Sequence, residues 1–252
     1  MQNQKNSFLW IFVIICLRFT PIFAAELDDC MTSRFILVSD ESNRTTAGFS
    51  LPTTWWSRPY EYTWAAKFTG SQLNVLDAAC GVSHPFKWLL GMTCKKTWAC
   101  DLDSRLIAPE LLKKEILDDL GQDNYNQFIK NSHMFKNVEL FLHSICSLPD
   151  SLPLLDRIFC ISTLEHMTPT ARKQALSEFA RKLSPDGLVV ITMDYPLVPL
   201  NEFFDSVKQA NLVPAGKVEM ETPSQNALFS DTAIPNARLF VYRCILRHKN
   251  EE

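Results

Sequence analysis

The sequence predicts an α/β protein with a mostly parallel sheet that is covered by helices on both faces. From about residue 72 onward, short apolar runs alternate with amphipathic stretches, which is the order typical of βα units. The apolar runs are continuous, as expected for strands that are buried on both faces. The composition agrees, because 46% apolar and 21% charged residues describe an ordinary globular chain.

Seven segments are predicted to be strands. The five that should form the parallel part are Leu73–Ala79, Lys96–Leu102, Val138–Leu142, Arg157–Ser162 and Leu188–Met193. A strong strand over Arg238–Leu246 ends the chain, and a weaker one over Lys217–Glu221 precedes it. Each of the five central runs is short enough for a strand and too short for a typical helix.

Start and stop signals place the helices between these strands. Thr168 followed by Pro169 predicts a helix start, because threonine caps helices and proline is tolerated in the first turn. Asn201 is expected to cap a later helix. After the second strand the pattern is less regular, since Pro109 interrupts it. The polar residues 122–137 are expected to form a loop.

The N-terminus differs from the rest of the chain. Lys5 precedes an unbroken apolar run, Phe8–Leu17, which is too short to span a bilayer and suits a secretion signal. Residues 1–25 are therefore predicted to be a signal peptide or a short membrane anchor, so a membrane contact through residues 8–17 stays open. The alternative is an upstream extension, with Met31 opening the polypeptide. Residues 26–70 are expected to form an aromatic strap or lid, and residues 71–247 the main domain.

Cysteine usage and charge narrow the function classes. Cys16 lies in the leader, and the seven remaining cysteines include no CxxC pair and no zinc-like spacing, so we expect free thiols and no metal site. Free thiols indicate the cytoplasm, whereas the leader indicates export or membrane attachment, and the compartment stays open. The net charge of −3 gives no electrostatic argument for a nucleic-acid partner.

The stretch VLDAACGVSHPF, Val75–Phe86, predicts a binding site. Asp77 closes the first apolar run, and a compact turn of small residues follows in a chain with only seven glycines. In open α/β sheets, ligands bind beyond the carboxyl ends of the strands. We expect main-chain amides at Cys80 and Gly81 to grip a nucleoside. Asp101, 20 positions after Gly81, should accept from the ribose hydroxyls, with Asp103 as an alternative.

This turn resembles the nucleotide loop of the class I S-adenosylmethionine-dependent methyltransferases, Leu-Asp-x-Gly-Cys-Gly-x-Gly, within a methyltransferase type 11-like pattern. In the matching stretch, Leu76–Ser83, Ala79 and Ser83 replace two glycines. FCISTLEHM, Phe159–Met167, resembles the family's fourth strand and its exit. LSPDGLVVITMDYP, Leu183–Pro196, resembles its fifth strand. In this order the resemblance covers about 175 residues, from about 72 to 247.

The resemblance implies a Rossmann-like, seven-stranded, mostly parallel sheet with an antiparallel last strand. It also implies S-adenosylmethionine as cofactor and methyl transfer by in-line displacement. The residues that would bind the cofactor are Asp77, Ala79, Cys80, Gly81, Asp101, Leu102, Ser144, Ile145 and Ser162. Ser144 stands where the family often has an acidic residue that faces the adenine amino group.

The acceptor is predicted to be a small molecule. Family members that act on base nitrogens usually carry Asn/Asp-Pro-Pro-Tyr/Phe after the fourth strand, whereas this chain has Ser162–His166 there. A protein acceptor stays open, nucleic acid is not expected, and the oligomeric state is not predicted.

A general base is needed only if the acceptor must lose a proton. Candidates near strand ends are His84, His166, Glu165, Asp194 and Tyr195. His166 and Tyr195 are the weak candidates, and the catalytic residue stays unknown.

The segment TTWWSRPYEYTW, Thr53–Trp64, gathers aromatic side chains before the first strand. It is either a lid, with Arg58, Tyr60 and Tyr62 near the substrate, or a strap packed on the flank of the sheet.

Two other functions stay open. One is a non-catalytic cofactor-binding module of the same fold, and the other is a nicotinamide-dependent oxidoreductase, which the missing glycine-rich pyrophosphate loop disfavours.

Overall fold

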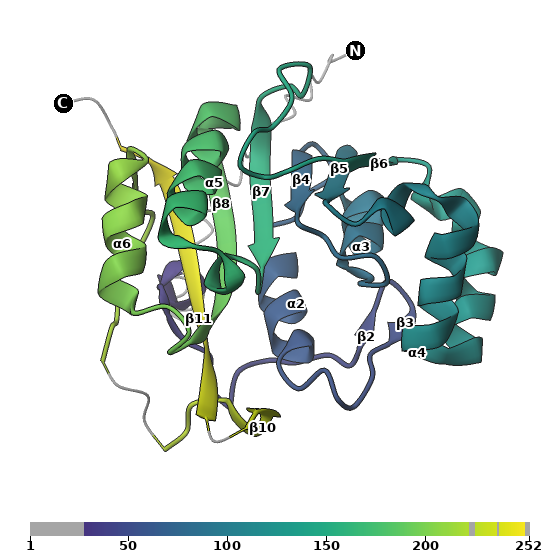
Figure 1. Cartoon of the computed structure of the whole chain (residues 1–252), viewed down its shortest axis with the longest axis horizontal. Helices are drawn as coiled ribbons and strands as arrows, with labels where there is room; N and C mark the ends of the chain where they lie inside the picture. The colour runs from purple at the N-terminus through teal and green to yellow at the C-terminus, as the bar shows by residue number, and fades with distance from the viewer. Residues whose placement is uncertain (1–27, 222–224, 236, 250–252) are drawn as a thin grey trace, which may run out of the picture.

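The computed structural model of the chain describes residues 28–221, 225–235 and 237–249 (Figure 1). The predicted signal peptide or anchor, residues 1–25, lies outside these ranges. Within them, no helix combines the length and the apolar character that a bilayer crossing requires.

The centre of the fold is a parallel sheet in the order β8-β7-β4-β5-β6. Its strands are β4 (Asn74–Ala78), β5 (Lys96–Asp101), β6 (Val138–Leu142), β7 (Leu155–Ile161) and β8 (Leu183–Tyr195). The chain builds outward from β4 to β6 and then returns to place β7 on the other side of β4. The predicted fold class and all five predicted parallel strands are confirmed, and the strand order reverses between β4 and β7.

Antiparallel strands extend this sheet beyond β8. The long strand β11 (Ala237–His248) pairs antiparallel with β8, which confirms the strand predicted over Arg238–Leu246. The short strands β1 (Arg34–Phe35), β9 (Leu212–Pro214) and β10 (Phe229–Ile234) pair with β11, so the described sheet has nine strands instead of seven. A separate ribbon joins β2 (Thr45–Thr46) to β3 (Phe49–Ser50). The weak strand predicted at Lys217–Glu221 is wrong, since Val218 makes only an isolated bridge with Ser33.

Helices cover both faces of the sheet (Figure 1). They are α2 (Arg58–Ala66), α3 (Phe86–Thr93), α4 (Pro109–Asn131), α5 (Pro169–Lys182) and α6 (Leu200–Gln209), with short 3-10 helices η1 (Ser104–Ile107), η2 (Ser132–Phe135) and η3 (Leu164–His166). Side chains of α2 and α3 share a core with Val75 and Val190, whereas those of α5 and α6 share one with Leu76 and Val189. Successive residues of a strand point to opposite faces, which explains the two cores.

The loop predicted over residues 122–137 is wrong, because α4 continues to Asn131 and η2 follows it. The helix is kinked at Gly121, whose φ is 81°. Beyond the kink, Phe128 packs in a third core, and the Asn124 side chain accepts from the Ser50 amide at 2.8 Å. Tertiary contacts therefore stabilise a polar segment as helix.

The helix starts were predicted with mixed success. The Thr168 cap is confirmed, since its side chain accepts from the Ala171 amide at 3.3 Å. Pro109 begins α4 instead of interrupting a helix. Asn201 is not a cap, because α6 begins one residue earlier, after Pro199.

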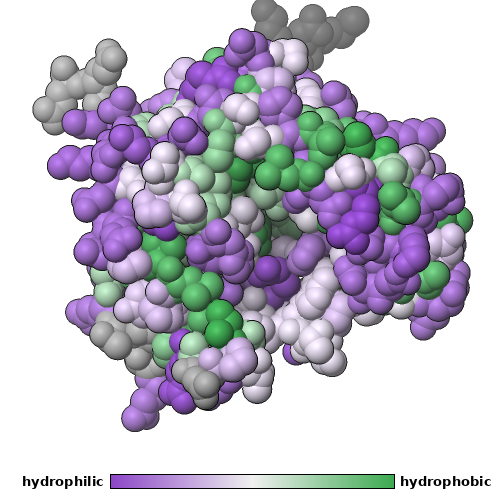
Figure 2. All heavy atoms as spheres, viewed as in Figure 1, coloured by the Kyte–Doolittle hydropathy of each residue, from purple (hydrophilic) through white to green (hydrophobic). Residues whose placement is uncertain are grey.

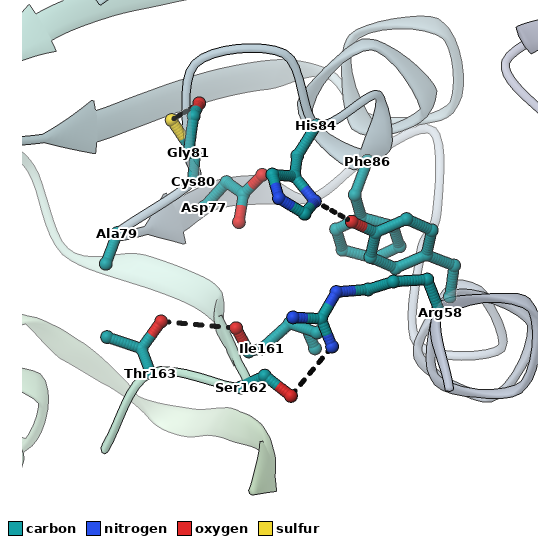
Figure 3. Close-up of a pocket in the computed structure, with 11 residues that line it drawn as sticks. Arg58, Asp77, Ala79, Cys80, Gly81, His84, Phe86, Ile161, Ser162 and Thr163 are labelled. Carbon is teal, nitrogen blue, oxygen red and sulfur yellow. Dashed lines mark hydrogen bonds between the residues drawn. The ribbon is translucent and has the colours of Figure 1, made fainter. Parts of the chain in front are cut away.

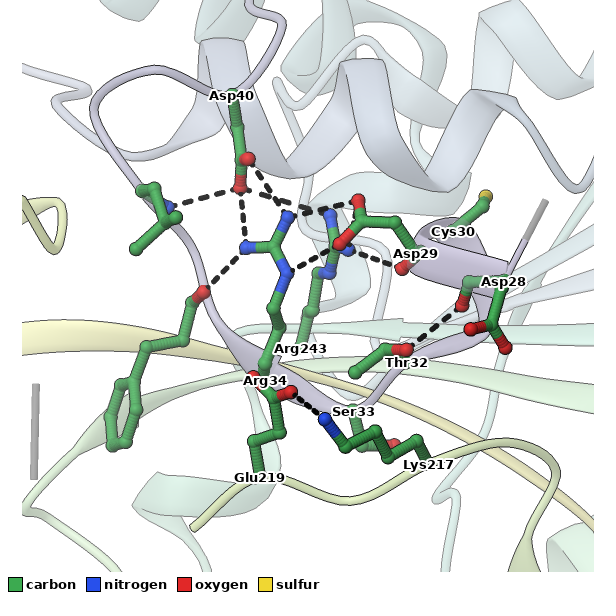
Figure 4. Close-up of polar contacts among 12 residues, drawn as sticks. Asp28, Asp29, Cys30, Thr32, Ser33, Arg34, Asp40, Lys217, Glu219 and Arg243 are labelled. Carbon is green, nitrogen blue, oxygen red and sulfur yellow. Dashed lines mark hydrogen bonds and ion pairs between the residues drawn. The ribbon is translucent and has the colours of Figure 1, made fainter. Parts of the chain in front are cut away.

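An ion-pair cluster ties the N-terminal segment to β11 (Figure 4). Arg34 contacts Asp29 at 2.8 Å and Asp40 at 2.9 Å, and Arg243 of β11 contacts Asp29 at 3.0 Å. The hydrogen bond from Arg34 is the main cause that lowers the pKa of Asp29 to about 2. The segment before α2 is thus attached to the sheet through buried guanidinium groups.

Candidate functional site

A pocket opens where β4 and β7 end on either side of the strand-order reversal. Its volume is about 180 Å³. Figure 2 shows the molecular face hollowed near its centre, close to where β7 ends beside α2. Eight residues that the sequence singled out line it, namely Arg58, Tyr62, Asp77, Ala79, Cys80, Gly81, His84 and Ser162. Phe86, Ile161 and Thr163 complete the lining.

The turn after β4 adopts left-handed backbone conformations. Ala79 has φ 57° although it carries a side chain, at a cost of about 1–2 kcal/mol, and it stands where the resembling family has glycine. Gly81 has φ 62°, and a Cβ there would lie 2.6 Å from Cδ2 of His84. Ser83 replaces the other glycine and donates to Asp119 of α4 at 2.6 Å. The turn therefore keeps its shape despite both replacements.

The expectation that the Cys80 and Gly81 amides face a ligand is wrong. The Cys80 amide donates to the Cys100 carbonyl at 2.9 Å, and the Gly81 amide donates to Oδ2 of Asp101 at 2.9 Å. Both amides are thus used to attach the turn to β5. Asp101 also accepts from the Asp103 amide at 3.0 Å. Since each carboxylate oxygen has two lone pairs, Asp101 can still accept from a ligand hydroxyl.

Lys87 is a residue of this site that the sequence analysis missed. Its side chain is fully buried, and Nζ donates to the carbonyls of Gly81 at 2.8 Å and His84 at 2.6 Å, with Cys80 O at 3.4 Å. Lys87 therefore holds the carbonyl side of the turn while β5 holds the amide side. The available signal was one charged residue in an otherwise uncharged helix, Phe86–Thr93.

Asp77 lines the pocket and carries a buried carboxyl oxygen that the described chain leaves unsatisfied. The residue is 3% exposed, and Oδ2 has no hydrogen-bond partner among the residues that the structure describes. Burial raises the pKa of Asp77 to about 7, with Lys87 opposing the rise and Asp101 adding to it. A buried acceptor of this kind is suited to a ligand that brings a donor or a positive charge.

The opposite wall carries the guanidinium of Arg58 from α2, which is paired with Glu61 (Figure 3). Nη1 of Arg58 donates to Ser162 Oγ at 2.7 Å and to the carboxylate of Glu61. Glu61 is fully buried and also accepts from Ser162 at 2.8 Å and from Thr192 at 2.6 Å. Burial acts to raise the pKa of Glu61, but Arg58 and these hydrogen bonds outweigh it, so the pKa is lowered. Arg58 and Glu61 are therefore both charged.

Aromatic side chains cover one side of the pocket. Tyr62 Oη lies 2.7 Å from Nδ1 of His84, and the Trp55 ring stacks on His84 at 4.2 Å. Burial, followed by the charges of Arg58 and Lys87, lowers the pKa of His84 well below its usual value. His84 is thus neutral, and with the Tyr62 hydroxyl as donor its Nε2 carries the ring proton.

The remaining predicted cofactor residues lie outside the pocket lining. Asp101 contacts the turn, and Leu102 beside it is 72% exposed. Ser144 accepts from the Cys146 amide at 3.1 Å, whereas Ile145 belongs to the core.

The other candidates from the sequence are also elsewhere. Tyr60 packs with Trp56 near β11. His166 is exposed at the surface, and the Tyr195 ring packs edge-on to Phe35 at 5.3 Å. Neither of the two weak catalytic candidates lines the pocket. The cysteines from Cys30 to Cys244 are all free thiols in the described part of the chain.

Comparisons with known proteins address the domain and the fold of the chain. A family model described as a methyltransferase domain matches residues 76–191. A search of curated proteins finds no match. The fold is similar to a TehB-like S-adenosylmethionine-dependent methyltransferase from Corynebacterium glutamicum, with 16% identity, TM-score 0.50, and 75% of this chain and 87% of that chain covered.

Two further structures share the fold. An S-adenosylmethionine-dependent methyltransferase from Clostridium acetobutylicum has 12% identity and TM-score 0.50, over 79% of this chain and 93% of that chain. The YcgJ protein from Bacillus subtilis has 13% identity and TM-score 0.50, over 75% of this chain and 99% of that chain. Together with this shared fold, the family model assigns residues 76–191 to a methyltransferase domain, and S-adenosylmethionine is its cofactor.

Proposed function

We propose that the protein transfers the methyl group of S-adenosylmethionine to a small-molecule acceptor, with the amino-acid end of the cofactor in the pocket. The observation that supports this placement is a carboxyl group and a guanidinium on opposite walls of the pocket. Asp77 offers an unsatisfied carboxyl oxygen on one wall, and Arg58 offers a guanidinium on the other. An amino-acid end carries an ammonium and a carboxylate, which match these two groups.

The size of the pocket supports this partial occupancy. A volume of about 180 Å³ is below the roughly 300–1,000 Å³ of pockets that enclose a whole ligand. The nucleoside would therefore extend outward over the ends of β4 and β5. Asp101 lies there beside Gly81 to accept from ribose hydroxyls, and the exposed side chain of Leu102 offers an apolar surface to the base.

The cofactor supplies a methyl group on a positively charged sulfur, so the task of the protein is to hold donor and acceptor in line. Asp77 and Arg58 would fix the amino-acid end from two sides. Trp55 and Tyr62 cover His84 and would shield the reacting centre from water, which is the lid role considered for residues 53–64. Ser162–His166 in place of a base-nitrogen motif favours a small acceptor over a nucleic acid.

Calorimetry tests the proposal. S-adenosylhomocysteine should bind and NAD should not, and Arg58→Met should weaken S-adenosylhomocysteine binding by about tenfold or more, as expected for a lost charged hydrogen bond. Arg238→Met is the matched control, because Arg238 is an exposed residue of β11 that pairs with Asp231. Binding without methyl turnover on any acceptor would favour the non-catalytic module, and absence of S-adenosylhomocysteine binding would refute the proposal. Unchanged affinity and turnover in Arg58→Ala would exclude the lid.

A further inference from the structure

Two more carboxyl groups lie behind the Arg58 wall of the pocket. Asp194 is the penultimate residue of β8, and its amide donates to Oε1 of Glu165 in η3 at 3.1 Å. Glu165 is 6% exposed. Oε2 of Glu165 and Oδ1 of Asp194 are both buried, and neither has a hydrogen-bond partner within the described ranges of the chain. Two adjacent buried acceptors are therefore left unsatisfied by the protein itself.

The charges around this pair do not balance. The charges of Glu61 and Arg58 in α2 shift the pKa of Asp194. The charges of Asp194 and Glu61 shift the pKa of Glu165. Burial first and the neighbouring carboxylates second raise the pKa of Glu165 to about 8 and that of Asp194 to about 7. Arg58 is already paired with Glu61. A positively charged group that entered here would relieve the shortage of positive charge.

Arg172 of α5 lies near Glu165 on the other side. Its guanidinium donates to the main-chain carbonyls of Leu164 and Met167, both at 3.3 Å. The charge of Glu165 acts to raise the pKa of Arg172, although burial is the larger influence and lowers it. Arg172 thus holds the backbone of η3 through Nε and Nη2, while its buried Nη1 has no partner in the described chain and does not satisfy the two carboxyl oxygens.

Aromatic rings lie next to Asp194. Asp194 and Val241 are partners in the β8–β11 ladder, so their side chains project to the same face. Val241 belongs to a small core against which Trp56 and Tyr60 pack, and both rings are only partly buried. Carboxylates together with aromatic faces are the chemistry that recognises an ammonium group.

Building on the proposed function, we propose that the methyl acceptor is an amine that binds between α2 and the end of β8, against Asp194, Trp56 and Tyr60. This position is next to the cofactor pocket, because Ser162 lines that pocket and donates to Glu61, whose charge in turn acts on Asp194. A bound ammonium would supply a positive charge next to the buried carboxyl groups of this wall.

The reaction balances with these groups. The ammonium gives one proton to the Asp194 carboxylate and becomes a neutral amine. Its lone pair forms the N–C bond to the methyl group while the C–S bond breaks and sulfur keeps the electron pair. The products are an N-methylammonium, S-adenosylhomocysteine and protonated Asp194, which returns its proton to solvent.

The test compares ligands of one size on the protein saturated with S-adenosylhomocysteine. At pH 7.5, calorimetry should show that 2-phenylethylamine binds about tenfold or more tightly than 2-phenylethanol, and that 3-phenylpropionate binds most weakly. Asp194→Asn should lower the amine-to-alcohol ratio by about fivefold or more and leave S-adenosylhomocysteine affinity unchanged. The matched control is Asp205→Asn on the exposed face of α6, which should keep the ratio.

Turnover gives an independent readout. Methylation of 2-phenylethylamine should rise with pH through an apparent pKa near the value of about 7 for Asp194, and Asp194→Asn should remove that dependence. Equal binding of amine and alcohol, including no binding of either, would overturn the inference, as would an unchanged ratio in Asp194→Asn. Failure of S-adenosylhomocysteine to bind would instead reject the proposed function, and the amine-to-alcohol ratio on the free protein would still decide the acceptor class.

Discussion

Replacing Asp77 by asparagine separates the stability of the site from its ability to bind. Asparagine keeps the size of the side chain and removes the ionisable group. In the structure the Asp77 carboxyl is 3% exposed, and its Oδ2 meets no donor in the part of the chain that is described. The wild-type protein therefore accommodates a charge that its own residues do not satisfy.

The size and sign of the effect follow from the pKa of Asp77. Burial raises this pKa from 3.8 to about 7, which corresponds to about 4 kcal/mol of unfolding free energy. Because the pKa is raised in the folded state, this contribution of Asp77 to the unfolding free energy is fully present below pH 3.8. It is lost as the pH rises to about 7. Asparagine does not ionise and escapes this loss. Lys87 loses a counter-charge in the variant, so we expect a gain of about 2–4 kcal/mol at pH 7.5.

Urea unfolding at pH 4.5 and pH 7.5 measures this difference. Asp77→Asn should exceed the wild type at pH 7.5 and show a much smaller advantage at pH 4.5. Asp205→Asn, at an exposed position of α6, should follow the wild type at both values. The same Asp77→Asn protein should lose about tenfold or more in S-adenosylhomocysteine affinity, since the ammonium loses its carboxylate. A variant that is equally destabilised at both pH values would refute the reasoning.

Four further outcomes are expected. Lys87→Met should lower the unfolding free energy by about 3 kcal/mol in urea and weaken S-adenosylhomocysteine binding, because loop carbonyls lose a buried donor; unchanged binding would show that the turn does not depend on Lys87. At pH 6.0, binding of S-adenosylhomocysteine should release up to about one proton, because Asp77 ionises. Calorimetry in MES and in imidazole buffer measures this proton release as a difference between the two binding heats. Equal heats, after correction for the dilution of the ligand, would contradict it. Asp101→Ala should cost about 1–3 kcal/mol of S-adenosylhomocysteine affinity by calorimetry, and no loss would exclude the ribose contact. Thr168→Ala should cost about 1 kcal/mol in urea unfolding through the lost helix cap, with binding unchanged, and a changed affinity would instead link α5 to the site.

Local sequence patterns were sufficient to predict the central sheet and one side of the candidate site. Continuous apolar runs predicted the five parallel strands within a few residues, because strands buried on both faces need apolar side chains at every position. The turn after β4 was predicted to follow Asp77 for a similarly local reason, since small residues there permit left-handed backbone. The neighbouring position of Asp101 followed from the spacing of one βα unit.

Short strands and the second half of α4 were missed because their stability comes from distant partners. The strands β1, β9 and β10 have two to six residues each and are defined by their pairing with β11. Residues 122–131 are polar and show no helical stripe, yet contacts such as the bond between Asn124 and Ser50 hold them in α4.

The fold class, the position of the turn and the carboxylates that flank it could be predicted from local sequence patterns, because they depend on residues close together in the chain. The role of Lys87 in holding the turn, and the attachment of the turn's amides to β5, became visible only in the folded structure. The folded structure also brings Thr192 to within hydrogen-bond distance of Glu61, 131 positions away in the chain. Glu61 in turn pairs with Arg58 and holds it at the pocket. Electrostatic energy depends on distance in space and on burial, and neither can be calculated before the strands are ordered.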